Sequence, residues 1–132
     1  MDERQRKALE ALCERHDIDL VVGFGSAFTG RSGARSDIDI AVRVAPGRPA
    51  PSRFELVGEL TGVFGEEVDV AVLNDLDSET LRFEIFRDGR PLFDAREGVF
   101  CDEASLAIRR YADTAWLRER ARDALRQALE RP

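Results

Sequence analysis

Hydrophobic and polar residues follow two different periodicities along the chain, and each change of periodicity marks a new element. Apolar residues recur at helical spacing over residues 3–15 and again over 54–64. Between and after these helices, the aliphatic run 18–24 and the strictly alternating segments 37–44 and 67–73 have the pattern of strands. The pattern therefore predicts the order helix, strand, strand, helix, strand.

The part of the chain beyond residue 73 is predicted to be mostly helical. Asp77 or Ser78 can cap a helix that ends before Gly89, and residues 91–93 have the pattern of a short edge strand. Residues 101–130 contain neither Gly nor Pro, which favours one long C-terminal helix. The fold class predicted is α/β (α+β), with a small mixed β-sheet flanked by helices.

Length and composition limit the classes of protein that this chain can represent. A chain of 132 residues with 43% hydrophobic content suits a single domain over 1–132, whose core we place at about 18–75. The net charge of −6 does not favour direct nucleic-acid binding. Two isolated cysteines and the absence of any apolar run of ~20 residues predict a soluble cytoplasmic protein without a membrane segment.

Three aspartates interrupt the apolar pattern of the two alternating strands. Asp37 and Asp39 share one face of their strand, about 6.5 Å apart along the backbone. Asp69 lies at a comparable place in the third strand. Carboxylates on neighbouring strands repel one another unless cations are present. Asp37, Asp39 and Asp69 are therefore candidate catalytic and metal-ligating residues for two Mg²⁺ ions, which can hold nucleotide phosphates and activate an attacking oxygen.

A glycine-rich element precedes the first of these aspartates. The strand leads into Gly23-Phe24-Gly25-Ser26, where main-chain N–H groups can approach a phosphate closely because glycine carries no side chain. Ser26 adds a hydroxyl donor. Ser36 either steadies the turn before Asp37 or contacts a phosphate itself. A Gly-x-Gly-Ser string and an Asp-x-Asp pair are each common alone, and it is their combination at this spacing that predicts a nucleotide site.

The segment GSAFTGRSGARSDID resembles the signature of the DNA polymerase β-like nucleotidyltransferase superfamily. Asp69, in GEEVDVAVL, falls where that superfamily places its third carboxylate. The short length resembles the minimal nucleotidyltransferases, the MntA-like antitoxins that pair with HEPN-domain toxins. The resemblance implies that Gly25 and Ser26 hold the triphosphate of ATP, that Asp37 and Asp39 ligate both metals, and that Asp69 helps to activate the acceptor hydroxyl.

The same resemblance implies a function. An MntA-like antitoxin would transfer AMP from ATP to a tyrosine of a HEPN ribonuclease and silence it, within a hetero-oligomer of the two proteins. The short chain beyond Leu73 offers little to enclose a small acceptor, which favours a protein acceptor. Two alternatives remain: a nucleotidyltransferase for a small hydroxylated molecule such as an aminoglycoside, and a non-catalytic antitoxin that acts by occlusion.

Overall fold

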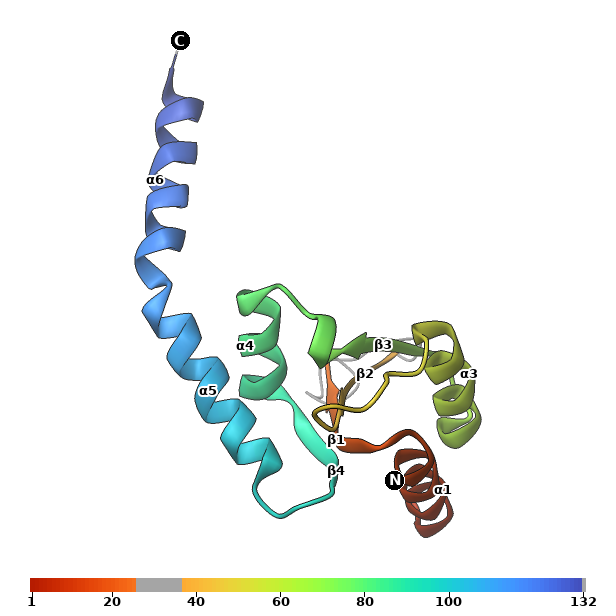
Figure 1. The fold of residues 1–132 in the computed structure, drawn as a ribbon. Coiled ribbons are helices and arrows are strands. Elements are labelled where there is room, and N and C mark those ends of the chain that lie inside the picture. Colours follow the sequence, from red (N-terminus) through yellow and green to blue (C-terminus); the bar gives the residue numbers. More distant parts are fainter. Residues whose placement is uncertain (26–36, 132) are drawn as a thin grey trace.

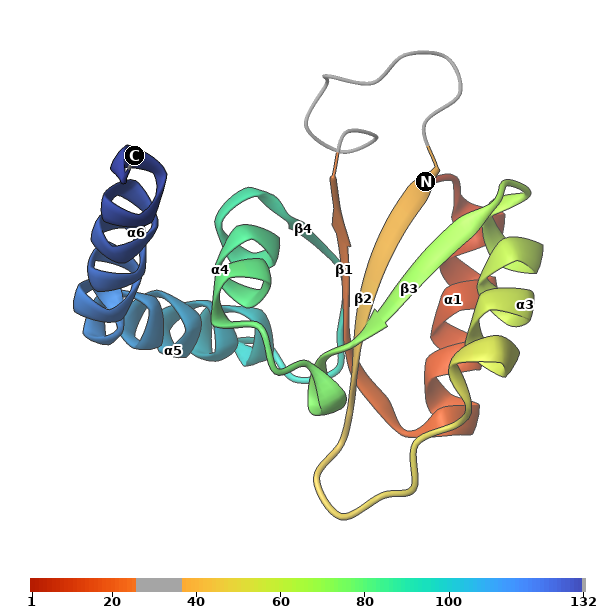
Figure 2. The ribbon, with the colours of Figure 1, turned by 90° about the horizontal axis from the view of Figure 1, so that it is seen from above.

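The computed structural model describes residues 1–25 and 37–131, which form a four-stranded mixed sheet with helices on both faces (Figures 1 and 2). The observed boundaries differ from the predicted ones by one or two residues at most as far as residue 94. In chain order the elements are α1 (Glu3–His16), β1 (Ile18–Phe24), β2 (Ile38–Val44), α3 (Arg53–Phe64), β3 (Val68–Val72), the short 3-10 helix η1 (Leu73–Asp75), α4 (Glu79–Asp88), β4 (Arg90–Asp94), α5 (Val99–Asp113) and α6 (Ala115–Glu130).

The strands lie in the order β3-β2-β1-β4. Strand β1 pairs antiparallel with both β2 and β4, whereas β2 and β3 are parallel, with Asp39 opposite Asp69. The predicted edge strand is confirmed, since β4 closes one side of the sheet and carries Pro91. Proline is tolerated there because an edge strand has one side free of ladder hydrogen bonds.

Helices α1 and α3 cover one face of the sheet (Figure 2). Asp2 and Gln5 form a reciprocal capping box at the start of α1, and Ser52 caps α3, which ends at Gly65 in the left-handed conformation. The core on this face consists of Leu9, Leu12, Cys13, Ile18, Val21, Ile40, Val42, Val44, Leu56, Leu60, Val68 and Val70.

Helices α4 and α5 cover the opposite face (Figure 2). Ser78 caps α4, as one of the two predicted residues. The alternation in β2 and β3 is confirmed, because their large aliphatic residues face α1 and α3 while Ala41 and Ala71 face α4 and α5. The second core consists of Leu20, Val22, Ala41, Leu73, Ile85, Phe86, Val99 and Ala107.

The prediction of one long C-terminal helix is wrong in one respect, because the helix is divided at Thr114 into α5 and α6. The Tyr111 carbonyl accepts hydrogen bonds from Arg118 Nη2 at 2.6 Å and from Thr114 Oγ1 at 3.2 Å. These two side chains therefore occupy the Tyr111 carbonyl, which in a continuous helix would accept a hydrogen bond from the main-chain N–H four residues later.

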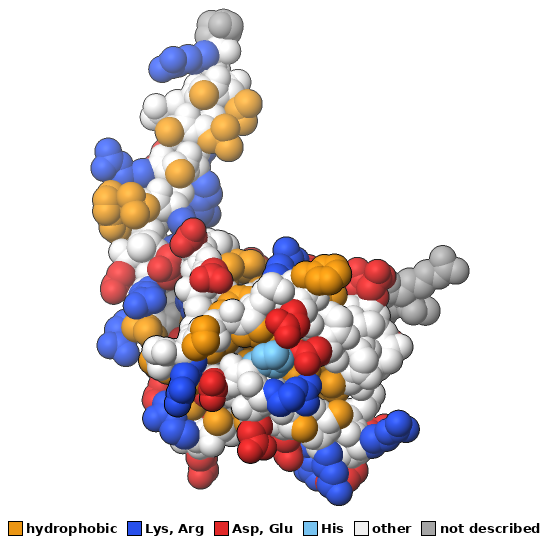
Figure 3. Space-filling model, turned by 45° about the vertical axis from the view of Figure 1, so that its right-hand side comes forward, with side chains coloured by type: hydrophobic (Ala, Val, Ile, Leu, Met, Phe, Trp, Pro, Cys, Tyr) orange, Lys and Arg blue, Asp and Glu red, His pale blue; other side chains and the backbone are white. Residues whose placement is uncertain are grey.

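Helix α6 projects from the body of the molecule (Figure 1) and buries none of its residues. Apolar side chains therefore remain exposed along this arm (Figure 3). No helix in the described part of the chain combines the length and the apolar character needed to cross a bilayer. The exposed large apolar residues of α6 are Trp116, Leu117, Leu125 and Leu129.

Candidate active site

The three predicted aspartates come from adjoining positions on two parallel strands. Asp39 and Asp69 are register partners in β2 and β3, and Asp37 directly precedes the first residue of β2. Neighbouring strands lie about 4.8 Å apart, so register partners carry their side chains side by side on one face. Ile40 and Val70, the next residues along the two strands, point into the core beneath α1 and α3. Because side chains alternate along a strand, Asp39 and Asp69 are on the opposite face, which α4 and α5 cover.

Gly25 adjoins the same carboxylates from the end of β1. Its φ of 77° is in the left-handed region, and a Cβ built at this position would lie 2.2 Å from Asp39 Oδ2. Glycine is therefore required twice, for the backbone conformation and for the close approach of Asp39 to the chain. The other two residues predicted to bind nucleotide, Ser26 and Ser36, lie outside the described residues.

The electrostatic environment of Asp39 disfavours its charged form. Partial burial raises the pKa of this carboxyl, and the neighbouring charges of Asp69 and Asp37 raise it further. Among the described residues, no Lys or Arg forms an ion pair with Asp39. The three carboxylates together therefore carry an excess of negative charge, which a bound cation would neutralise.

A cavity of about 700 Å³ lies beside these carboxylates, along the edge strand β3. Asp39 and Asp69 line it, together with the end of β1, the chain before α3, β3, η1 and α4. A volume of this size is within the range of ligand-binding pockets, about 300–1,000 Å³. Its lining residues are Phe24, Asp39, Ala50, Pro51, Ser52, Arg53, Asp69, Val70, Ala71, Val72, Asp75, Leu76 and Leu81.

The donor set fits a magnesium ion. Mg²⁺ prefers oxygen ligands and is usually held by one or two carboxylates, with water and substrate phosphates completing the octahedron. Asp39 and Asp69 offer such oxygens on adjacent strands, and Asp37 offers a third carboxylate two residues from Asp39. Burial and the neighbouring carboxylates raise the pKa of Asp39 and so disfavour its charged form. A bound cation would offset both effects, which is consistent with this fit.

Arg53 is a residue of this site that the sequence analysis did not identify. Its Nη2 donates to Asp69 Oδ1 at 2.6 Å, and its Nε donates to the main-chain carbonyl of Val70 at 2.9 Å. One signal in the sequence could have found it, since Arg53 directly follows the helix-capping Ser52. A cation in the first turn opposes the helix dipole, which suggests a partner other than the helix itself.

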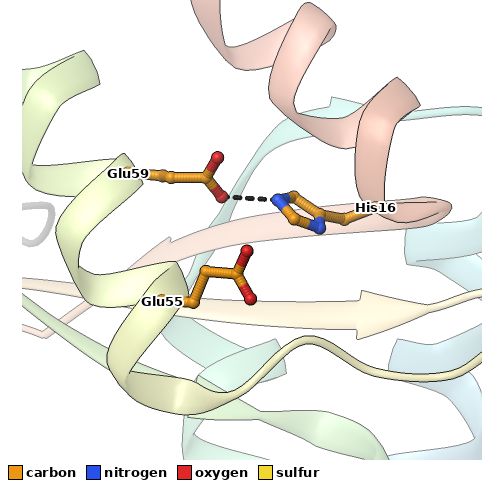
Figure 4. Close-up of side chains that lie close together, drawn as sticks. All are labelled: His16, Glu55 and Glu59. Carbon is orange, nitrogen blue, oxygen red and sulfur yellow. Dashed lines mark hydrogen bonds and ion pairs between the residues drawn. The ribbon is translucent and has the colours of Figure 1, made fainter.

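A second acidic group lies in the layer of α1 and α3, where His16, Glu55 and Glu59 bring ligand atoms within 4.8 Å of one another (Figure 4). Glu59 is already neutralised by side chains of α1, because His16 Nε2 lies 2.5 Å from one oxygen and Arg15 Nη2 lies 3.0 Å from the other. Partial desolvation acts to raise the pKa of Glu59, but hydrogen bonds from Arg15 and His16 outweigh it and lower the pKa. This group therefore joins two helices.

Comparison with known proteins assigns the fold. The family model described as "Polymerase beta, Nucleotidyltransferase" matches residues 7–98. A toxin–antitoxin structure with AMP-PNP has a TM-score of 0.75 at 24% identity, over 91% of this chain and 97% of that chain. A complex of the tri-AMPylated HEPN toxin and MNT antitoxin of Shewanella oneidensis has a TM-score of 0.70 at 23% identity, over 95% of this chain and 98% of that chain.

A third solved structure, of a protein classed as a minimal nucleotidyltransferase, is 32% identical over 66% of this chain and 88% of that chain, with a TM-score of 0.55. No curated protein sequence matches the chain. The family match extends over more than half of the sequence and includes Gly25, Asp37, Asp39 and Asp69. This protein belongs to the polymerase β nucleotidyltransferase family.

Proposed function

We propose that this chain is a magnesium-dependent nucleotidyltransferase that transfers AMP from ATP to a tyrosine of a cognate HEPN toxin and thereby neutralises the toxin. The observation that carries the proposal is the placement of Asp39 beside Asp69, against Gly25 and at the wall of a cavity. A stable fold has no need of these neighbouring carboxylates with a single arginine partner, whereas phosphoryl chemistry uses them.

Each residue has a defined part in the reaction. Asp37 and Asp39 would hold the cations, with Asp69 as a further ligand, while the main chain at Gly25 and the hydroxyl of Ser26 bind the triphosphate. The acceptor hydroxyl oxygen bonds to the α-phosphorus, the bond from that phosphorus to the bridging oxygen breaks, and pyrophosphate leaves. Asp69 receives the hydroxyl proton. When bound, Mg²⁺ would neutralise the negative charge of the phosphates, which the neighbouring carboxylates would otherwise repel.

The acceptor is inferred from two kinds of observation. The cavity beside Asp69 is lined by β3, η1, α4 and the chain before α3, but not by α5 or α6, so the terminal helices do not enclose a small substrate. A protein side chain held by its own domain suits such a site. Among the structural relatives, an MNT antitoxin is found in complex with a tri-AMPylated HEPN toxin, which supports a HEPN acceptor for this chain too.

A second candidate is transfer to a small hydroxylated molecule such as an aminoglycoside. The specific observation in its favour is the cavity volume of about 700 Å³, which suits a drug-sized ligand. The acceptor in the two candidates differs, while the nucleotide, the metal and the aspartates are the same. One assay that offers both acceptors therefore separates them.

The test is to incubate the protein with Mg²⁺, ATP and a co-expressed HEPN partner, and to measure the intact mass of every component. The proposal predicts a mass gain of one or more AMP groups on the partner. It also predicts that substitution of a tyrosine at the modified position prevents the gain. A gain on an added aminoglycoside alone would support the second candidate instead.

The Asp39→Asn variant supplies the control for occlusion without catalysis. It removes one charge and preserves the shape of the side chain, so binding to the partner should persist while transfer stops. If the variant neutralises the toxin as well as the wild type does, and no component gains AMP with any nucleotide, the chain acts by occlusion and the catalytic proposal is wrong.

A further inference from the structure

Arg53 makes two hydrogen bonds to consecutive residues of β3, at the open edge of the sheet. Nη2 contacts Asp69 Oδ1 at 2.6 Å and Nε contacts the Val70 carbonyl at 2.9 Å. The planar guanidinium presents its donors in a fixed fork, so two acceptors determine its orientation as well as its position. The Asp69 carboxylate is thereby held by one oxygen, Oδ1, and its other oxygen is left for a different partner.

Fold stability does not account for this arrangement. The side chains of Arg53 and Asp69 are 65% and 60% exposed, and ion pairs this open contribute little to stability because water screens them. Arg53 also occupies the first position of α3, where a positive charge opposes the helix dipole and has a small cost of its own. The two effects are of similar size, so the pair has little net value for folding.

The position of the Arg53–Asp69 pair at the candidate site indicates a role in orienting Asp69. Asp69 and Arg53 both line the cavity beside Asp39, and Asp69 is the register partner of Asp39. A metal-ligating carboxylate is generally oriented by a hydrogen bond to its second oxygen, and such partners affect metal affinity. Arg53 donates such a hydrogen bond to Asp69. Its second hydrogen bond, to the Val70 carbonyl, holds the guanidinium in place whether or not a ligand is bound.

We propose that Arg53 is a positioning residue that orients Asp69, through Oδ1, for the metal and the acceptor hydroxyl. This inference rests on the proposed function and adds to it a residue from outside the three aspartates. The opposite role would be that of a competitor, in which Arg53 takes the place of a metal ion at Asp69. The two roles predict opposite changes in metal affinity when Arg53 is removed.

The experiment measures Mn²⁺ affinity of the full chain by electron paramagnetic resonance, with Arg53→Ala, Arg53→Lys and wild type compared. Arg53→Ala should weaken Mn²⁺ binding by about 10- to 100-fold, the usual effect of losing a residue that orients a ligand. Arg53→Lys should recover only part of the loss, because an ammonium group lacks the two-point fork. The turnover number should fall in the same order, with the KM for ATP less affected.

Arg48→Ala is the matched control, because Arg48 is 63% exposed and pairs with Asp17 at 4.0 Å, away from the cavity. It should bind Mn²⁺ as the wild type does. Unchanged or tighter Mn²⁺ binding by Arg53→Ala would overturn the inference and, if Asp39→Asn still lost Mn²⁺, would leave the proposed function standing. Equal Mn²⁺ binding by the wild type and Asp39→Asn would overturn both the inference about Arg53 and the proposed function.

Discussion

The molecule contains two acidic groups that differ in how their charge is balanced. In the layer of α1 and α3, Glu59 accepts hydrogen bonds from Arg15 and interacts with His16, and its pKa is lowered. At the cavity, Asp39 lies beside Asp69 and Asp37, and its pKa is raised. In the first group Glu59 has an arginine partner of its own, whereas no Lys or Arg among the described residues pairs with Asp39.

From this difference we infer that the Glu59 group serves the fold, and we propose that the aspartates serve function. A carboxylate that is paired within the protein stabilises the native state, whereas neighbouring carboxylates that repel one another reduce stability. Perturbed groups of the second kind cluster at functional sites. His16, Glu55 and Glu59 bring ligand atoms close together, yet the interactions of this group are those of an interhelical ion pair.

The largest expected difference between the groups is in activity. Asp39→Asn should reduce AMP transfer by more than about 100-fold, because loss of a residue that merely orients a metal ligand already costs 10- to 100-fold. Glu59→Gln should leave the transfer rate within about twofold of wild type. Steady-state rates at saturating Mg²⁺ and ATP measure both. Comparable losses in the two variants would remove the functional distinction.

A pair of glycines tests the contact between Gly25 and Asp39. Gly25→Ala and Gly47→Ala both place a side chain in the left-handed region, at φ of 77° and 80°, at a cost of about 1 kcal/mol each. Only at Gly25 would the new Cβ meet Asp39. Among the described residues, no atom outside the adjoining residues of the chain lies within 4 Å of a Cβ built at Gly47. Gly25→Ala should therefore lower activity by up to about 100-fold, and Gly47→Ala should not.

Denaturant unfolding should reveal the opposite ranking for stability. Glu59→Gln should lower the free energy of unfolding by about 0.5–1 kcal/mol, because it weakens contacts between α1 and α3. Asp39→Asn should leave it unchanged or raise it slightly, since repulsion from Asp69 and Asp37 is relieved. A larger loss of stability in Asp39→Asn would show that Asp39 supports the fold.

The smallest effect is on the pH dependence of stability. The pKa of Glu59 is lowered from 4.5, so its contribution is present above that pH and is lost as the pH falls. The pKa of Asp39 is raised from 3.8, so the folded state binds its proton more tightly and stability falls as the pH rises through that window. The free energy of unfolding, measured between about pH 3 and pH 6, should no longer show the Glu59 contribution in Glu59→Gln. In Asp39→Asn it should no longer show the decrease with rising pH that Asp39 causes.

Local patterns were sufficient to predict most of the fold. Alternation in residues 37–44 and 67–73 predicted which face of each strand is apolar, and the structure confirms this because those residues pack against α1 and α3. The helix break at Thr114 was missed. It depends on side-chain hydrogen bonds from Thr114 and Arg118 to a main-chain carbonyl, and neither residue type ends a helix by itself.

The candidate site was predicted only in part, for a similar reason. The aspartates interrupt an otherwise apolar alternation, so the sequence itself marks them. Arg53 contacts Asp69 across 16 residues of sequence, and His16 contacts Glu59 across 43, so no local periodicity records either pair. The roles of Gly25, Ser26, Ser36 and the three aspartates in catalysis stay predictions until they are measured.

The most direct test of the central claim is to locate the bound metal. Mn²⁺ binding is measured for the wild type, Asp39→Asn and Glu59→Gln under one set of conditions. The account predicts that Glu59→Gln binds Mn²⁺ like the wild type and that Asp39→Asn loses it. Retention of Mn²⁺ by Asp39→Asn together with its loss in Glu59→Gln would place the metal between α1 and α3 and contradict the account.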